Sequence, residues 1–387
     1  MCLKRAVSGL LFLFFTIYSC ATEVTVAGFA FSGDYATAKE RFPYTFKHFD
    51  AAKSNPSGSF SKLIVDRMKT VSNPALTFNV SELADNKKSY QTLIAILVMT
   101  DEIVINDNFG DYYKTFINLR GNAMILDAQS NTLIRNYPVS VVIFDATEGR
   151  TPPSDKTISG FIDNLIGRSD DAGLIGQFVK KMEKATLPKE HTKTVQVKQG
   201  EISPEALAMM PLSLRNNPSA VNAMLADAFG SVLAARSSLA VLPNSVGHAA
   251  GTIGIRLEKG DDLNVKVGEG DYLFEVKLGK LIKKKLKETP AEELWAYGAL
   301  IHAKFYEPYL NEIYLESDFK NSETAIIPVG KISGDDFAAY NDAIIGLFKK
   351  FSMALNASGG EWIGKAASAK DIETQLSASR NKLDNTK

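Results

Sequence analysis

The feature that most constrains this chain is a long stretch of β pattern between residues 92 and 145. Residues 93–99 are a nearly continuous apolar run, and residues 112–119 alternate between apolar and polar side chains, which is typical of strands. Residues 121–127 lead into the small, polar segment Ala128-Gln129-Ser130 and a second apolar run. This arrangement predicts a hairpin, and we therefore expect an antiparallel sheet here.

Helical segments flank this stretch. Residues 23–31 alternate as a first strand, and Ser59 precedes a segment in which apolar residues recur at helical spacing, as expected for an N-capped amphipathic helix. Residues 75–80 predict a short strand, and residues 158–184 return to helical spacing. The first half therefore reads as strand, helix and strand, followed by antiparallel strands and a helix.

The second half of the sequence repeats this order. Residues 194–197 predict an opening strand, residues 220–236 a helix and residues 238–242 a short strand. Residues 252–257 and 263–267 then alternate as further strands of the second half. Such a repeat predicts two modules of one architecture.

Two local matches support the repeat. Gly270-Asp271-Tyr272 echoes Gly110-Asp111-Tyr112, and residues 298–314 lie over residues 121–137 without a gap. On this overlay residues 301–306 and 310–315 form the second hairpin. Thr289-Pro290-Ala291-Glu292, which lies between the two matches, has the pattern of a capping box and could open a helix.

Together these patterns predict an α+β fold of two similar mixed-sheet modules, closed by an amphipathic helix at residues 335–355. A linker rich in Lys and Thr marks the boundary. We expect a signal peptide at residues 1–21, a first α/β domain at residues 22–186, a second at residues 187–360 and a flexible polar tail at residues 361–387.

The N-terminus has the layout of an export signal. Lys4 and Arg5 precede an apolar run over residues 6–19 that is too short to span a bilayer. Two processing routes fit. Signal peptidase could cleave after Ala21, or Cys20 could be the lipid-bearing first residue of a lipoprotein. Either route predicts a protein in the periplasm, at the outer membrane or secreted.

The charge balance and the cysteine content limit the kinds of partner that can be expected. Lys plus Arg equals Asp plus Glu at 44 each, which argues against nucleic acid and against a general attraction to anionic membranes. The Lys-rich run at residues 280–287 is best explained as a solvated face at the end of an element. Cys2 and Cys20 are the only cysteines, so no internal disulfide is expected in the mature protein, and membrane contact is expected only through a lipid at Cys20.

No catalytic or metal-binding pattern stands out. The four histidines, His48, His191, His248 and His302, are scattered and lack metal-ligand spacing. Adjacent acids such as Asp170-Asp171, Asp261-Asp262 and Asp335-Asp336 are typical of turns and helix starts. We therefore assign no catalytic residue, cofactor or metal from the sequence.

An aromatic segment remains as a candidate for binding. Phe42, Tyr44, Phe46 and Phe49 lie close together before the first helix. They either pack over that helix or serve as aromatic anchors for a partner.

The elements follow the order strand, helix, short strand and Gly-led hairpin, from residue 23 to residue 144 and again from 194 to 315. This order resembles the periplasmic α/β domain shared by the curli secretion lipoprotein CsgG and the N-terminal domain of TolB. The resemblance implies a cell-envelope protein. The membrane-spanning strands of a secretion pore and the propeller repeats of TolB have no counterpart here.

These observations favour a non-enzymatic exported scaffold, adaptor or assembly factor that meets a protein partner in the cell envelope through sheet edges and aromatic loops. Two alternatives stay open. One is an extracytoplasmic hydrolase whose site is assembled from distant residues. The other is a module that binds a small molecule or glycan in a cleft between the halves.

Overall fold

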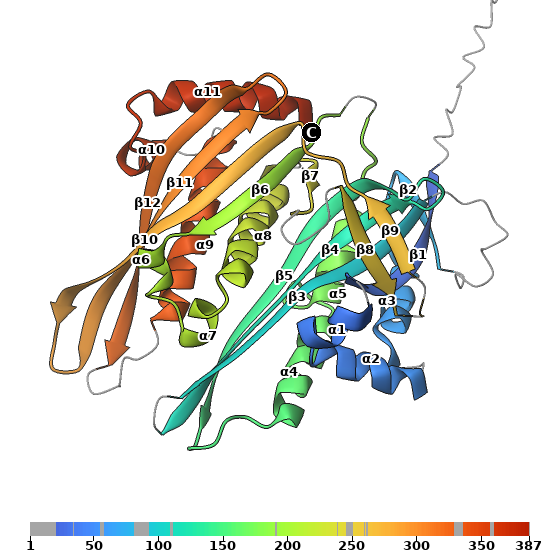
Figure 1. The fold of residues 1–387 in the computed structure, drawn as a ribbon, viewed down its shortest axis with the longest axis horizontal. Coiled ribbons are helices and arrows are strands. Elements are labelled where there is room, and N and C mark those ends of the chain that lie inside the picture. Colours follow the sequence, from blue (N-terminus) through green and yellow to red (C-terminus); the bar gives the residue numbers. More distant parts are fainter. Residues whose placement is uncertain are drawn as a thin grey trace, which may run out of the picture.

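The fold contains two sheets that alternate with helical layers (Figure 1). A computed structural model describes residues 21–33, 35–54, 58–80, 93–108, 111–189, 192–237, 239–244, 251–258, 260, 262–328, 336–356 and 360–386. The expected α+β class is confirmed. The predicted leader, including Cys20, lies outside these residues.

Sheet A has the strand order β2-β1-β3-β4-β5-β9-β8. Its strands are β1 (Thr22–Ser32), β2 (Leu76–Asn79), β3 (Leu93–Asn108), β4 (Tyr112–Asp127), β5 (Thr132–Glu148), β8 (Thr252–Leu257) and β9 (Asp262–Lys266). The helices of the first half are α1 (Tyr35–Arg41), α2 (Thr45–Ser54), α3 (Phe60–Met68), α4 (Asp155–Gly167) and α5 (Leu174–Glu183). Helices α3, α4 and α5 bury apolar side chains against one face of sheet A, which we call its front face.

Sheet B has the strand order β12-β11-β10-β6-β7. Its strands are β6 (Val195–Ile202), β7 (Val241–Leu242), β10 (Tyr272–Glu288), β11 (Glu292–Glu307) and β12 (Glu312–Pro328). The helices of the second half are α6 (Pro204–Leu207), α7 (Leu212–Arg215), α8 (Pro218–Ser237), α9 (Phe337–Leu355), α10 (Gly360–Ala366) and α11 (Ile372–Leu383), followed by the 3₁₀ turn η3 (Asp384–Thr386). Helices α8 and α9 pack on the front face of sheet B.

The strand registers reveal the duplication directly. The order β2-β1-β3-β4-β5 in sheet A equals β7-β6-β10-β11-β12 in sheet B, with parallel and antiparallel pairs in the same places. Irregular registers recur at equivalent points, as at Thr100 between β3 and β4 and at Gly279 between β10 and β11. Both hairpin turns end on an asparagine in the left-handed region, Asn131 with φ 51° and Asn311 with φ 52°. Since Asn tolerates this conformation better than most residues, the turn chemistry is shared.

The two asparagines correct the overlay predicted from the sequence. They differ by 180 in residue number, whereas the overlay of residues 298–314 on residues 121–137 implies a difference of 177, so it was displaced by three positions. An odd displacement assigns side chains to the wrong face of a strand. The Asp271 match was also wrong, because Asp271 precedes β10, the counterpart of β3, whereas Asp111 precedes β4.

The predicted division into two domains is wrong for the segment that contains β8 and β9. Strands β8 and β9, expected in the second domain, form a hairpin that joins sheet A through β1 and β5. The hairpin covers the back face of sheet A, where Ile255 and Val265 pack with Ile96, Val98 and Met124. The second half of the chain therefore completes the core of the first.

Helix α8 is shared by the two modules. It packs on β6 of its own sheet and on β5 of sheet A, and Figure 1 shows it between the two sheets. Its sequence is apolar on nearly all sides, as expected of a helix buried by both neighbours. The layers therefore run from the α3–α5 helices through sheet A, then α8 and α9, to sheet B.

Other predicted elements need correction. The helix expected at residues 158–184 is two helices, α4 and α5, because Gly173 and Gly176 approach the backbone of Arg168 and Asp170 too closely for a side chain. The capping-box segment at Thr289 does not open a helix. It is the turn between β10 and β11, where the hydroxyl of Thr289 accepts a hydrogen bond from the Glu292 amide at 3.0 Å.

The C-terminal tail is folded, contrary to the prediction of a flexible segment at residues 361–387. Helix α11 buries Ile372, Leu376 and Leu383 in the core of sheet B. The amide of Ala240 donates a hydrogen bond of 3.0 Å to the carbonyl of Thr386. One buried stripe at residues 372, 376, 379 and 383, three of them apolar and one a serine, holds the tail even though its composition is polar.

Candidate functional site

A buried ion-pair network joins the two modules at Arg120. This residue lies on β4 at the back face of sheet A, and only 3% of its side chain is exposed. Its guanidinium forms ion pairs with Asp101 of β3 and, at 2.8 Å, with Asp227 of α8. Burial raises the pKa of the Asp227 carboxyl, and the nearby Arg120 opposes that shift. Because Asp227 is on the shared helix, the pair fixes α8 against sheet A.

A second buried carboxylate lies next to this network. Glu102 of β3 accepts hydrogen bonds from the backbone amides of Tyr44 at 2.8 Å and Thr45 at 2.9 Å. These amides lie at the N-terminus of α2, where the positive end of the helix favours a carboxylate. Burial raises the pKa of the Glu102 carboxyl. The Thr45 hydroxyl, which also donates to Glu102, and the two amides oppose that shift. Glu102 therefore acts as the N-cap of α2 from a neighbouring strand.

Two cavities flank Arg120, and it lines both. The acidic cavity, about 510 Å³, is lined by Glu40, Asp101, Glu102 and Asp227, among others, between β3, β4 and α8. The basic cavity, about 400 Å³, lies between β4, β5, α5, α8 and α9. Arg120, Lys181 and Lys349 are its ionisable lining residues.

The charges of the acidic cavity are mostly satisfied within the protein. Asp101 and Asp227 bind Arg120, and Glu102 caps α2. Arg41 donates hydrogen bonds of 2.8 Å to the carbonyls of Ser32 and Thr100. This arrangement is typical of a polar network that fixes an interface rather than of free acid and base groups.

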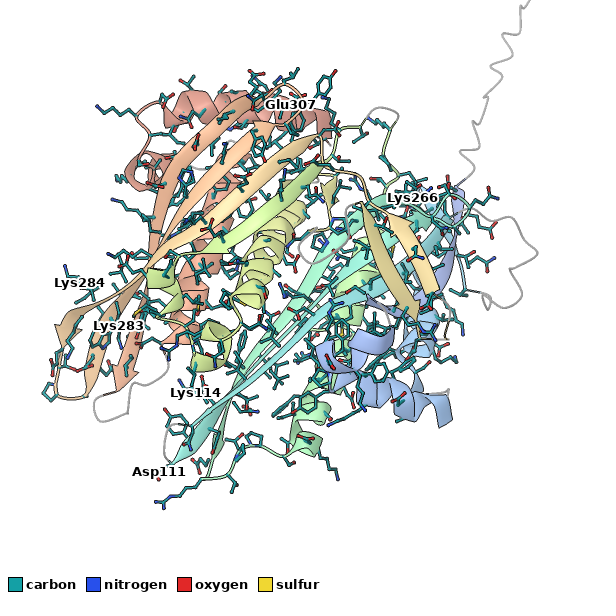
Figure 2. All side chains as sticks on the ribbon, viewed as in Figure 1. Asp111, Lys114, Lys266, Lys283, Lys284 and Glu307 are labelled. Atoms are coloured by element: carbon teal, nitrogen blue, oxygen red, sulfur yellow. The ribbon has the colours of Figure 1, made fainter. Side chains whose placement is uncertain are left out.

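Each sheet also ends in a projecting three-stranded ribbon. Ribbon A comprises residues 101–108, 112–119 and 142–148, and ribbon B comprises residues 282–288, 292–298 and 322–328. Figure 2 shows Asp111 and Lys114 on the first projection, and Lys283 and Lys284 on the second, far from Glu307. Both projections lie on the same side of the molecule (Figure 1).

The two ribbons differ in how far their apolar side chains are covered. In ribbon A, Val142 and Phe144 of β5 are 41% and 38% exposed, and Phe337 of α9 packs on Phe116 and Phe144 with ring centroids 5.0 and 6.2 Å apart. In ribbon B, three large apolar side chains are exposed: Ile282 at 46%, Leu286 at 51% and Ile326 at 63%. In the described part of the chain, β12 is the terminal strand of sheet B, and β11 is the one strand of the sheet that pairs with it.

The beginning of each edge strand is protected. The Gln177 side chain bonds both the amide and the carbonyl of Ser140 on β5, as a neighbouring strand would. On β12, Phe319 forms an isolated bridge with Ala367, and the Ser368 amide bonds the carbonyl of Asp318. These contacts end near residue 320, before ribbon B begins.

The aromatic residues predicted as partner anchors are mostly core residues. Phe42, Phe46 and Phe49 are 0%, 4% and 2% exposed and surround Phe31 of β1. These three cannot serve as surface anchors, because they fill the space between α1, α2 and sheet A. Tyr44 is half-buried, and its hydroxyl lies 3.4 Å from Asp155.

The ionisable residues singled out from the sequence do not come together. His48 pairs with Asp163 at 2.9 Å and stacks on Phe60, linking α2 to α3 and α4. His302 lies on the back face of sheet B, 2.9 Å from Asp318, and lines neither cavity. His191 and His248 lie outside the described residues. The acids of residues 170 and 171 pair with Arg168 and Lys180 at the surface.

The Lys-rich run on β10 is largely paired. Lys280 binds Glu205 at 2.9 Å, Lys283 binds Asp336 at 2.8 Å, and Lys285 binds Glu293 at 2.5 Å. These pairs agree with its interpretation as a solvated strand face.

Within the described ranges, no group of three His, Cys, Asp or Glu residues could hold a metal ion. No helix in these ranges has the length and apolar composition of a membrane span.

Sequence reasoning missed Arg120, Asp227 and Lys181. The available signals were an arginine within the strongly apolar β4 and a lone acid within the apolar α8. Neither signal identifies its partner, because the two residues are 107 positions apart.

No family model and no curated protein matches this sequence. Among solved structures, the chain is similar to protein XCC0632 from Xanthomonas campestris, described as family DUF330. The two share 12% identity with a TM-score of 0.22, over 45% of this chain and 86% of the other. A likeness of this extent supports no conclusion on fold or function.

Proposed function

We propose that this chain is a non-enzymatic, exported scaffold or assembly factor that binds a protein partner of the cell envelope by strand addition to β12 in ribbon B. One observation carries the proposal. The outer edge of β12 beyond residue 320 is unpaired among the described residues, and the ribbon exposes Ile282, Leu286 and Ile326. Natural proteins usually protect such edges, so an edge left open is a candidate for pairing with another chain.

The contrast within the same strand supports this choice. Near the β11–β12 turn, the edge is blocked by Ala367, Ser368 and the side chain of Gln375. The opposite end carries no equivalent cover in the described part of the chain. The export and lipid attachment at Cys20, and the resemblance to the CsgG and TolB domains, stay predictions that are compatible with this role.

Site-specific photo-crosslinking in native cells tests the proposal. A photoreactive residue at position 326 should give a discrete adduct with a partner, and the same residue at position 313 is the matched control. Ile313 is exposed to a similar extent, at 49%, but lies at the protected end of the same strand. Equal adducts at the two positions, or none at position 326, would contradict the proposal.

A second experiment tests export. Lipid labelling of cells that express the wild type and Cys20→Ala should show a label in the wild type alone if Cys20 is the anchor. A protein recovered from the cytosol with its leader intact would refute export altogether.

A further inference from the structure

The basic cavity has the composition of a ligand site. Its apolar wall is formed by Val142, Met224, Leu225, Val232, Ile344 and Ile345. Its volume of about 400 Å³ falls in the range of small-molecule pockets, about 300–1,000 Å³. The cavity therefore offers both a hydrophobic surface and space.

The charge in this cavity is of one sign. Arg120, Lys181 and Lys349 line it, and no acidic residue is among its described lining residues. Arg120 is neutralised by Asp101 and Asp227. Neither Lys181 nor Lys349 has a carboxylate within ion-pair distance among the described residues, so two cations here lack a counter-ion.

Lys181 is the better placed of the two. It is half-buried on α5, whereas Lys349 is exposed on α9. Burial lowers the pKa of Lys181, the neighbouring Lys180 and Lys184 add to this effect, and the more distant Asp171 opposes it. A bound anion would relieve this cost, since an opposite charge favours the protonated form.

Polar groups close to the cations complete the lining. Asn118, at 5% exposure, is next to Arg120 on the same face of β4, and its Oδ1 has no hydrogen-bond partner. Ser231 of α8 and Asn341 of α9 contribute further polar side chains. These groups restrict the polar end of a ligand to part of the cavity.

We propose that the basic cavity binds a single-chain anionic amphiphile, such as a fatty acid, with its carboxylate at Lys181 and its acyl chain against α8 and α9. The apolar wall selects the chain, because each buried methylene contributes favourably to transfer from water. The uncompensated lysines select the anionic head. A small inorganic anion would leave the apolar wall empty, and a cationic amphiphile would meet like charge.

Titration calorimetry on the mature chain tests this site. Laurate, below its critical micelle concentration, should bind saturably with one site per chain. Butyrate should bind at least about tenfold more weakly, because its chain is too short to cover the wall. Dodecyltrimethylammonium should not compete. To separate a free acid from a lipid, lysophosphatidylglycerol is compared with laurate in the same format, and the tighter ligand identifies the source.

Two neighbouring lysines provide matched variants. Lys181→Met should weaken laurate binding about tenfold or more, since it removes a charge-assisted contact. Lys180→Met should change binding far less than Lys181→Met, because Lys180 pairs with Asp171 outside the cavity and does not line it. Lys349→Met should give a smaller loss than Lys181→Met.

Three results would overturn the proposal. They are equal affinities for laurate and butyrate, equal losses in the two α5 variants, and binding that does not saturate. Unchanged thermal unfolding of Lys181→Met shows that its effect is local. Partner crosslinking at position 326 is independent of this cavity, so the two proposals fail separately.

Discussion

The two modules share their strand order but differ in what covers the back face of each sheet. Ile96, Val98 and Met124 of sheet A are fully buried beneath the β8–β9 hairpin. By strand register, Glu275, Lys277 and Lys304 occupy the corresponding positions of sheet B, where Lys277 is exposed and the other two are half-buried. Glu275 accepts a hydrogen bond from the Tyr306 hydroxyl, and Lys277 pairs with Glu201 on the neighbouring strand. One architecture therefore serves as a middle layer in one copy and as an outer layer in the other.

Arg120 shows the same contrast at a single position. Its counterpart in sheet B, 180 residues later, is Leu300, and the counterpart of its partner Asp101 is Lys280. The ion-pair network exists only in the module that has another layer against its back face. Duplicated modules thus diverged where one had to accept a neighbour and the other did not.

The largest expected effect tests the covered face. Ile96→Glu places in sheet A the residue type found at the equivalent position of sheet B, and we expect it to destabilise the fold by about 3–5 kcal/mol, because it buries an unpaired charge. The control, Glu275→Gln on the open face, should change stability by less than about 0.5 kcal/mol. Urea unfolding gives both values, and similar shifts would show that the two faces are equally covered.

The next effect concerns the link between modules. Asp227→Ala leaves Arg120 with one carboxylate, and we expect a loss of about 3 kcal/mol. The double variant Arg120→Leu, Asp227→Leu should lose less stability than Asp227→Ala, since it leaves no unpaired charge from this pair. It also places at position 120 the residue type that sheet B has at Leu300. The exposed pair Lys280 and Glu205 serves as control, and Glu205→Ala should cost less than about 1 kcal/mol. A double variant less stable than Asp227→Ala would contradict this account.

A somewhat smaller effect is expected at the tail, which only sheet B uses as cover. Leu376→Ala should cost about 2–3 kcal/mol, because it opens a cavity in the core beside α9. Glu373→Ala, at an exposed position of the same helix, is the control. Thermal unfolding followed by circular dichroism measures both, and equal midpoints would mean that the tail contributes no packing.

The smallest effect distinguishes the helical layer of the first module. The hydrogen bond to Asp163 raises the pKa of His48 above its ordinary value near 6.5. Protonated His48 therefore stabilises the fold below that value, and this contribution is lost as the pH rises through the raised pKa. The stability difference between wild type and His48→Asn should be at most about 1 kcal/mol at pH 5.5 and smaller at pH 8.5. In an Asp163→Asn background the difference should depend less on pH, because the largest cause of the raised pKa is removed.

Local signals predicted much of the fold. Ser59 caps α3 by accepting a hydrogen bond from the Lys62 amide, and the first hairpin turns at Asn131 as its polar sequence suggested. The difference between the sheets was also present in the sequence. Residues 93–99 are apolar on both faces, whereas the equivalent residues 272–278 of β10 place Glu275 and Lys277 on one face.

Long-range placement could not be predicted in this way. The alternating pattern of β8 and β9 correctly indicated strands, but periodicity does not tell which sheet a hairpin joins. The basic cavity unites Arg120, Lys181 and Lys349 from three elements, and no spacing connects them. The sequence left two alternatives open for the aromatic cluster, because burial, rather than residue type, decides whether Phe42 is an anchor or a core residue.

The β8–β9 hairpin has a consequence for the time course of folding. A ribosome delivers residues 22–186 first, but the back face of their sheet is closed only when residues 252–266 have emerged. Until then the nascent first module exposes the hydrophobic back face of sheet A to chaperones and proteases. The chain therefore cannot mature one module at a time, and nonsense truncations between residues 187 and 251 should yield a product that is rapidly degraded.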